Sequence, residues 1–526
     1  MNTMKKISKF TNSNEILKSN TKQITPNKKI RILVWLDFGP YAYFNFGIIS
    51  ALSKLDEFEF VGIVTIKKDM IFFQNQKFIK FKKLLYYPDC YIEKSTYDLK
   101  KLEKYEVQYD LNLWTDIFTE RSFYKYWIDF HKFSKNEILS IVENSITFFV
   151  NILETFEPDL VLMQQPGENI SNLLLYRITQ KIGIQTLMPN LLYMHNKIVI
   201  SDNIDSKEIS NKFNNLKNES NNSSKIYDEN FLKTNSFVKS MDVILSFNFD
   251  SKNLFQKMKY YIKRLWNEPE PLYLNKGKTR LKIFKNRIQS HFKIKNRKNF
   301  LDSNSVKSIN QKNFFYFPLQ GEPESIVLLK SPFYSDIITL IENIAKSIPI
   351  DSTLYVKEHP IQKEKFYRPV NVYQKIIDIP NVKLIHPDVN SQELISKSQA
   401  VFCLAGATGF EALFHKKPVI LFSNEYYDVH SMIYKVEKFS ELSTLVTQAI
   451  QNTKFSNNEL HALISASENI SISIPYFSML KDGITLSSIQ KHNDVSLTID
   501  NFKKYFEIYG NSFSLIAKTI NTKIKR

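Results

Sequence analysis

The chain has 526 residues, of which 43% are hydrophobic and 14% aromatic, enough for two domains with sizeable cores, and this composition excludes a disordered or fibrous protein. Two cysteines, Cys90 and Cys403, provide neither a disulfide framework nor a metal-ligand spacing, which suits a reducing compartment. The net charge of +18 indicates an anionic partner, such as a phosphorylated substrate, an anionic lipid or a nucleic acid.

Residues 1–28 are polar and lysine-rich and lack an apolar stretch of secretory length, so we expect a disordered lead and no signal peptide. No window reaches eighteen apolar residues, so we expect no transmembrane span. These features predict a cytoplasmic protein, with a peripheral position at the inner face of the cytoplasmic membrane if its basic segments bind lipid.

The N-terminal domain, 29–250, begins with a strand at Ile30–Leu36, an apolar helix at Phe44–Leu55 and a strand at Phe58–Ile66. This order starts a βαβ unit of a parallel sheet. Asp37 follows the first strand, where it is either a carboxylate facing a binding cleft or the cap of the next helix.

A second carboxylate, Glu168, follows the strand predicted at Leu160–Met163 and precedes a helix at Ser171–Lys181. It is a candidate general base, and the alternative is a charge that stabilises the helix N-terminus. The polar segment 203–236 is rich in Asn, Ser and Lys, so we expect a mobile insertion, before a strand at Met241–Phe247.

Residues 251–312 form a basic segment between the domains. From Lys252 to Lys298 it has fifteen Lys or Arg residues against two acidic ones, interleaved with apolar residues at helical intervals. This pattern is typical of an element on an anionic membrane surface, and also of a solvated connecting helix. Both interpretations stay open.

The second domain, 313–455, alternates apolar strands with helical segments, which predicts a doubly wound parallel sheet. The residues that follow, 456–526, are predicted to be a helical tail. The strands are expected at Phe314–Leu319, Thr353–Val356, Val382–Ile385, Ala400–Leu404 and Val419–Phe422.

Polar residues follow three of these strands, at the edge where open parallel sheets bind ligands. Gln320 leaves the first strand, and Lys357, Glu358, His359 and Pro360 leave the second. The turn at 357–360 is either part of a site or a charged surface turn.

The loop after the fourth strand contains Gly406, Ala407, Thr408 and Gly409, and Glu411 lies in the helix that follows. Only 11 residues of the chain are glycine, well below the usual share of about 7%. Small residues admit a ligand close to the backbone, and the N–H groups at a helix start attract phosphate.

These residues resemble the bacterial capsule polysaccharide biosynthesis protein family, which includes enzymes that transfer Kdo from CMP-Kdo. The resemblance covers roughly 310–450 well and the N-terminal half in outline. The matching pieces are FYFPLQGEPES (Phe315–Ser325), YVKEHP (Tyr355–Pro360), ATGFEAL (Ala407–Leu413) and KPVILF (Lys417–Phe422).

The resemblance implies a GT-B glycosyltransferase fold, in which two Rossmann-like domains face an interdomain cleft and the C-terminal domain holds the nucleotide-sugar. By the same resemblance, His359 and Pro360 contact the donor nucleotide, Thr408 lies near its phosphate and Glu411 accepts hydrogen bonds from its ribose. Ala407 stands where the family commonly has a serine, which removes one phosphate hydrogen bond, and Lys416 stands where it often has a glycine.

The predicted function is therefore transfer of a sugar from a nucleotide-activated donor, CMP-Kdo-like, to a hydroxyl of a surface or capsular glycan. Lys357, His359 and the 405–409 backbone would stabilise the leaving phosphate, and Glu168 or Asp37 would accept the proton. The nucleotide-sugar is a co-substrate, and no cofactor, bound metal or nucleic acid is expected. A sugar-nucleotide 2-epimerase, a polyol-phosphate transferase, a non-catalytic capsule assembly or export partner, and a charge-driven nucleic-acid binder stay open as alternatives.

Overall fold

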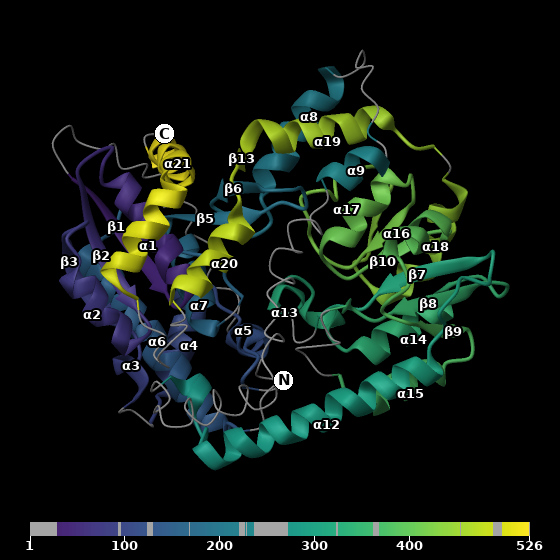
Figure 1. Ribbon diagram of the computed structural model, residues 1–526, viewed down its shortest axis with the longest axis horizontal. Coiled ribbons are helices and arrows are strands. Elements are labelled where there is room, and N and C mark those ends of the chain that lie inside the picture. Colours follow the sequence, from purple (N-terminus) through teal and green to yellow (C-terminus); the bar gives the residue numbers. More distant parts are fainter. Residues whose placement is uncertain are drawn as a thin grey trace, which may run out of the picture.

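The computed structural model describes residues 29–92, 96–123, 130–167, 169–219, 227, 229–235, 272–321, 325–360, 368–452, 454–487 and 497–524. Their strands form two separate sheets, one of seven and one of six strands, with helices on both faces of each (Figure 1). The expected lead at 1–28, the expected strand at Met241–Phe247 and part of the basic segment lie outside the described residues.

The first sheet has the order β13-β6-β5-β4-β1-β2-β3. The pairs among β1 to β5 are parallel, whereas β6 pairs antiparallel with β5 and with β13. Its strands are β1 (Ile30–Asp37), β2 (Phe58–Val64), β3 (Phe81–Tyr86), β4 (Leu160–Leu162), β5 (Gln185–Leu191), β6 (Lys197–Ser201) and β13 (Ile472–Ser473).

The second sheet has the order β12-β11-β10-β7-β8-β9, and all of its pairs are parallel. Counted from its own first strand this is 3-2-1-4-5-6, the order of a dinucleotide-binding Rossmann sheet, and the parallel part of the first sheet has the same order. The strands are β7 (Phe314–Pro318), β8 (Thr353–Lys357), β9 (Val382–Ile385), β10 (Val401–Cys403), β11 (Val419–Leu421) and β12 (Ile433–Lys435).

The prediction of two Rossmann-like parallel sheets is thus confirmed, with two antiparallel strands added at one edge of the first. In such a sheet the strand order reverses at a switch point, which here lies between β1 and β4 in the first sheet and between β7 and β10 in the second.

Side chains of successive strand residues point to opposite faces, which builds a core on each side of the second sheet. Phe315 and Phe317 of β7 pack toward α14 (Ile337–Ser347), α15 (Val370–Ile377) and α18 (Leu442–Gln451), while Phe314 and Tyr316 pack toward α16 (Ser391–Lys397), α17 (Ala407–Phe414) and α19 (Asn457–Ile470).

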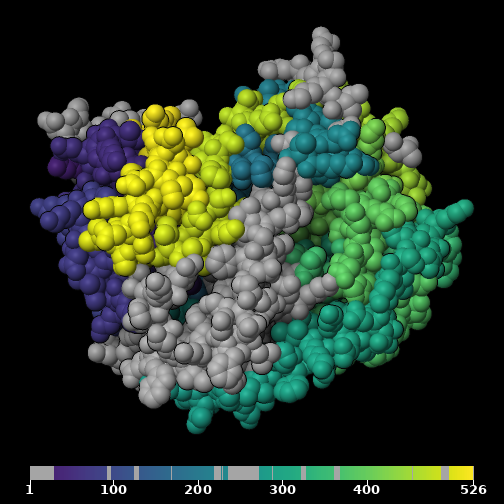
Figure 2. Space-filling view, viewed as in Figure 1, coloured from purple at the N-terminus to yellow at the C-terminus, as the bar shows by residue number. Residues whose placement is uncertain are grey.

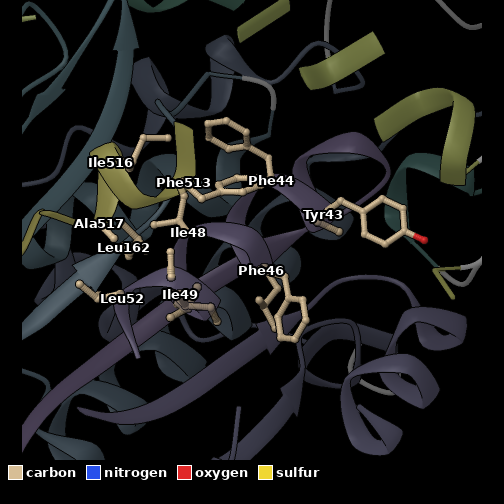
Figure 3. Close-up of a cluster of buried hydrophobic side chains, with 14 of the residues drawn as sticks. Tyr43, Phe44, Phe46, Ile48, Ile49, Leu52, Leu162, Phe513, Ile516 and Ala517 are labelled. Atoms are coloured by element: carbon tan, nitrogen blue, oxygen red, sulfur yellow. The ribbon is translucent and has the colours of Figure 1, made fainter. Parts of the chain in front are cut away.

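We call the part of the protein built around the first sheet the first half, and the part built around the second sheet the second half. The C-terminal helices α20 (Tyr476–Ser487) and α21 (Ile499–Ile524) belong to the core of the first half. Figure 3 shows α1 (Pro40–Leu52) packed against α21, with Phe44 beside Phe513. A Cβ at Gly47 would lie 2.4 Å from the ring of Phe513, so only glycine allows this approach. The tail therefore completes the first domain.

The other face of the first sheet is covered by α6 (Lys135–Phe156) and α7 (Ile170–Ile182). Among the described helices, α6 is long and apolar enough to cross a membrane, but 67% of that stretch is buried inside the protein. The smaller elements are α2 (Lys67–Asn75), α3 (Asp89–Ile92), α4 (Leu99–Tyr109), α5 (Leu113–Thr119), α13 (Ser325–Lys330), η2 (Tyr273–Asn275), η3 (Pro332–Tyr334) and η5 (Phe439–Glu441).

The segment 203–236 is not simply a mobile insertion. Its described residues form α8 (Lys207–Glu219) and α9 (Glu229–Asn235), and Ile209 and Phe213 are buried in a core cluster with residues of α17 and α19. The segment is mostly polar, but its few apolar residues recur at helical spacing and pack against the second half of the protein.

Candidate functional site

A cavity of about 770 Å³ lies at the switch point of the second sheet, and residues from both halves line it. The first half contributes Gln165, Asn190, Tyr193 and Phe477. Nine of the ten predicted donor-binding residues line this cavity, namely Gln320, Lys357, Glu358, His359, Pro360, Gly406, Ala407, Thr408 and Glu411. The two turns that the sequence singled out therefore meet at one site.

Buried hydrogen bonds hold the turn after β8. Glu358 is 1% exposed and accepts hydrogen bonds from the backbone N–H of His359 at 2.6 Å and from the hydroxyl of Tyr373 at 2.5 Å, and it pairs with buried Arg368. A buried carboxylate needs a cation and hydrogen-bond donors of this kind, because breaking a buried pair is strongly destabilising. Glu358 thus fixes the backbone from which His359 projects. The charged side chains of Lys357 and Glu358 are buried, so the alternative of a charged surface turn does not describe them.

A chain of contacts connects this turn to the ends of β7 and β10. Arg368 donates through Nη2 to the carbonyl oxygen of Gln320 at 3.1 Å, and the amide of Gln320 donates to the carbonyl oxygen of Ala405 at 2.8 Å. The two strand ends that flank the switch point are therefore joined directly. Arg368 was missed in the sequence because its role depends on its partner ten residues earlier.

The helix α17 begins at Ala407, so Ala407 and Thr408 lie in its first turn and not in the loop as predicted. Gly406 precedes the helix with a φ of 99°, a conformation that favours glycine, and a Cβ there would meet no atom within 4 Å. Gly409 does not line the cavity: a Cβ on it would lie 2.5 Å from the hydroxyl of Tyr427, so glycine serves close packing there.

Glu411 lines the cavity, and only one of its two buried carboxylate oxygens has a hydrogen-bond partner among the described residues. Its Oε2 accepts a hydrogen bond from Gln392 at 2.8 Å, whereas Oε1 is buried without a hydrogen-bond partner among the described residues. Burial raises the pKa of this carboxyl from 4.5 to about 7, against the lowering influence of Gln392 and Lys357. An acceptor in this state suits a ligand that donates a hydroxyl.

The two basic residues of the β8 turn differ in their electrostatics. Burial is the main cause that lowers the pKa of His359, so its imidazole is neutral at neutral pH and acts through hydrogen bonds. Lys357 is 4% exposed, and its ammonium donates to the hydroxyl of Ser391 at 2.5 Å. A buried cation is therefore present beside the cavity.

Glu425 is a central residue of the site that the sequence prediction did not single out. Its carboxylate accepts the N–H of Gly406 at 3.1 Å, pairs with Lys330 at 3.1 Å and accepts the hydroxyl of Tyr193 at 3.1 Å. Tyr193 follows β5 of the first sheet, so this contact connects the two halves across the cavity wall. Its position in the loop after β11 was the available signal.

Asp37, one of the two predicted catalytic carboxylates, does not line this cavity. Glu168 lies outside the described residues, and Asp37 is 7% exposed with a φ of 61° and accepts the N–H of Phe38 through Oδ1. The residues next to them, Phe38 and Asn169, line a second cavity of about 350 Å³ at the carboxyl edge of the first sheet. Both carboxylates stay predictions.

No group of three or more His, Cys, Asp or Glu residues in the described part of the chain is arranged to hold a metal ion. The charged groups at the cavity instead form pairs with one another or with hydroxyl and amide groups.

Comparison with known proteins gives matches to sugar-nucleotide enzymes and to capsule proteins. The Escherichia coli capsule polysaccharide export protein KpsS is 27% identical over 108 residues, 19% of this chain, and the match spans 28% of that protein's length. The beta Kdo 2,7 transferase of Thermosulfurimonas dismutans KpsC aligns over 60% of this chain and 78% of its own, at 13% identity and a TM-score of 0.31.

The UDP-GlcNAc 2-epimerase of Neisseria meningitidis, bound to UDP-GlcNAc, aligns over 84% of this chain and 98% of its own, at 16% identity and a TM-score of 0.24. Scores of this size indicate distant similarity and carry no argument about activity.

Two Rossmann-like domains with a cavity between them, at the carboxyl edge of the second sheet, define an α/β protein of the GT-B-like class. Residues 241–454 match the family described as capsule polysaccharide biosynthesis protein. This matched part contains the second sheet and most of the residues that line the cavity.

Proposed function

We propose that the protein is a glycosyltransferase that moves a sugar from a nucleotide-activated donor to a hydroxyl of a surface or capsular glycan. One observation supports this most directly: the turns after β8 and β10 line a single cavity at the switch point, and a buried carboxylate oxygen of Glu411 in that cavity has no partner among the described residues. A nucleotide-sugar offers both the phosphates and the hydroxyls that such a cavity can bind.

In this proposal the nucleotide lies between the two turns. The ribose donates a hydroxyl to Glu411 Oε1, and His359 contacts the base or ribose as a neutral imidazole. The phosphates face the start of α17 and the ammonium groups of Lys357 and Lys330, whose side chains line the same cavity. Preformed hydrogen-bond donors at the helix start, together with these ammonium groups, would stabilise the negative charge that develops on the departing nucleotide.

The acceptor hydroxyl approaches from the first half and loses its proton to a carboxylate. Asp37 and Glu168 are the candidates, since their sequence neighbours line the second cavity at the edge of the first sheet. The family's CMP-Kdo chemistry makes a CMP-linked acidic sugar the first donor to test. We propose that no metal and no further cofactor take part, so activity should survive treatment with EDTA.

The test is a thermal-shift panel of CMP, UDP and other nucleotides on the wild type and on His359→Ala. A rise in melting temperature with one nucleotide, lost in the variant, supports the donor site. The matched control is His291→Ala, an exposed histidine of α12, which should keep the rise. No response of the wild type to any nucleotide would overturn the proposal.

A second measurement separates transfer from epimerisation. Release of free nucleotide from the donor should require the acceptor glycan, because transfer consumes both substrates. Interconversion of the donor sugar without an acceptor would replace the transferase proposal by an epimerase.

A further inference from the structure

The helix α12 (Arg280–Asn304) joins the two halves of the protein at one edge (Figure 1). Near its N-terminal end, Lys276 pairs with Glu137 of the first half, and the ammonium of Lys282 donates to the carbonyl oxygen of Phe130 at 3.3 Å. Near its C-terminal end, Leu301 lies in the core of the second half and Asp302 contacts His386 at 3.0 Å. Both ends of the helix are therefore anchored.

Between these anchors, α12 presents an apolar stripe to solvent, which we call the α12 stripe. It consists of Leu281, Phe284, Ile288 and Phe292, which are 83%, 43%, 44% and 59% exposed. The spacing of three, four and four residues puts all four side chains within one side of a helix. The stripe lies opposite Arg297 and Leu301, the buried residues of the same helix.

Basic side chains border the α12 stripe. Lys282, Lys285, Lys295 and Lys298 are exposed, and no acidic residue occurs between Arg280 and Leu301. In Figure 2 the lower rim of the molecule carries the teal colour of this part of the chain. Exposure of two aromatic and two aliphatic side chains to water is unfavourable. With the surrounding positive charge, this surface is complementary to one that is both anionic and apolar.

From this arrangement we propose that α12 docks on an anionic lipid membrane, with the α12 stripe inserted at the headgroup boundary and the lysines on lipid phosphates. Lipid is favoured over nucleic acid because the centre of the surface is aliphatic as well as aromatic, whereas a nucleic-acid surface uses bases that stack on rings. Because both halves hold α12, docking brings the whole enzyme to the membrane without a separate anchor.

The experiment measures binding of the full chain to vesicles of phosphatidylcholine with and without phosphatidylglycerol, by flotation. We expect binding only to the anionic vesicles, decreasing as salt is raised. The double variant Phe284→Ser/Phe292→Ser should lower the partition coefficient by at least about tenfold through lost apolar burial. The double variant Lys285→Glu/Lys295→Glu should lower it by more than about tenfold, since it reverses two charges.

The matched control is Phe333→Ser with Lys346→Glu. It removes an 83% exposed phenylalanine and reverses an exposed lysine outside α12. It should bind like the wild type. All variants should keep the wild-type melting temperature, because the changed side chains are exposed.

The proposal would be overturned if the wild type did not bind anionic vesicles, if both α12 variants kept the binding, or if a generic RNA bound tightly and competed with the vesicles. A dimer in lipid-free solution that the stripe variant converts to monomer would also overturn it, by assigning the stripe to a second copy of the chain. Nucleotide-induced thermal shifts of the α12 variants should match the wild type, so failure here is distinct from failure of the proposed donor site.

Discussion

The two halves of the protein share a strand order but use their switch points differently. Between β1 and β4, Gln164 donates to Asn45 at 2.5 Å, Asn45 donates to the carbonyl oxygen of Trp35 at 3.0 Å, and Tyr476 of the tail donates to Gln164 at 3.4 Å. These groups are buried and satisfy one another. Between β7 and β10, the corresponding position borders the 770 Å³ cavity.

Strand order alone therefore does not decide where a ligand binds. The first switch point is filled by amide side chains and by the C-terminal tail, whereas the second is lined by residues with charge and unused hydrogen-bonding capacity. What separates them is the side chains at the strand ends. Substitutions at the strand ends and in the two cores test that difference.

The largest effect is expected for Arg368→Ala, which leaves the buried carboxylate of Glu358 without its cation. Breaking a buried ion pair from one side costs about 3–5 kcal/mol, so the melting temperature and nucleotide binding should both fall. The control is Lys397→Ala, which removes an exposed pair with Glu393 and should cost about 0.3–0.5 kcal/mol. Equal losses in the two variants, measured by urea denaturation, would contradict a special role of the buried pair.

Gly47→Ala tests the packing of α1 against α21 in the first half. The added methyl group collides with the ring of Phe513, so the free energy of unfolding should drop by about 1–3 kcal/mol. Nucleotide affinity should not change, because neither Gly47 nor Phe513 lines the binding cavity. The control is Gly510→Ala in α21, where no atom lies within 4 Å of the new carbon, and it should stabilise the helix by up to about 1 kcal/mol.

Glu411→Gln separates stability from binding. The pKa of Glu411 is raised to about 7 in the folded protein from an ordinary value of 4.5, so the stability that this group contributes is complete below 4.5 and is lost as the pH rises through 7. Above that pH the variant should melt at a higher temperature than the wild type.

The same variant should bind nucleotide more weakly above the pKa, since it replaces the carboxylate that accepts the ligand hydroxyl. Wild-type affinity, followed by calorimetry, should fall as the pH decreases through about 7, and this dependence should be absent in Glu411→Gln. A variant that keeps the pH dependence would exclude Glu411 as its source.

The smallest effect is expected for Ala407→Ser, which adds a hydroxyl in the first turn of α17. Ala407 lines the cavity in the first turn of α17, so the new hydroxyl can donate to a donor phosphate and tighten binding by about 0.5–1.5 kcal/mol. Ala412→Ser, buried in the same helix away from the cavity, should give no gain. Unchanged affinity in Ala407→Ser would place the phosphate elsewhere.

Much of the second half was predictable because its strands are short apolar runs that end in polar turns. The predicted limits of β7, β9 and β11 agree with the structure to within one residue, and the residues that leave β7, β8 and β10 meet at one cavity. Local sequence determines where such a strand stops, and the parallel sheet then brings the strand ends to a common edge.

The unpredicted features depend on distant partners. The strand β6 pairs with β13, whose two residues lie some 270 positions later in the chain. No local sequence pattern predicts that pairing. Glu425 and Gln392 became recognisable only through Tyr193, Gly406 and Glu411. The position of Glu425 after β11 indicated a place at the ligand-binding edge of the sheet, but its partners in other elements could not be predicted from its own stretch of sequence.

The place of α21 in the core of the first half has a consequence for synthesis. Its residues Phe502, Phe513 and Ile516 pack in one cluster with Ile32 and Val34 of the first strand, so that cluster needs both ends of the chain. On the ribosome, the second Rossmann sheet emerges entire before the last helix is made. The core cluster around the first strand therefore cannot be completed before α21 has been made, although that strand is translated first, and unpacked apolar strands are prone to aggregation in the meantime.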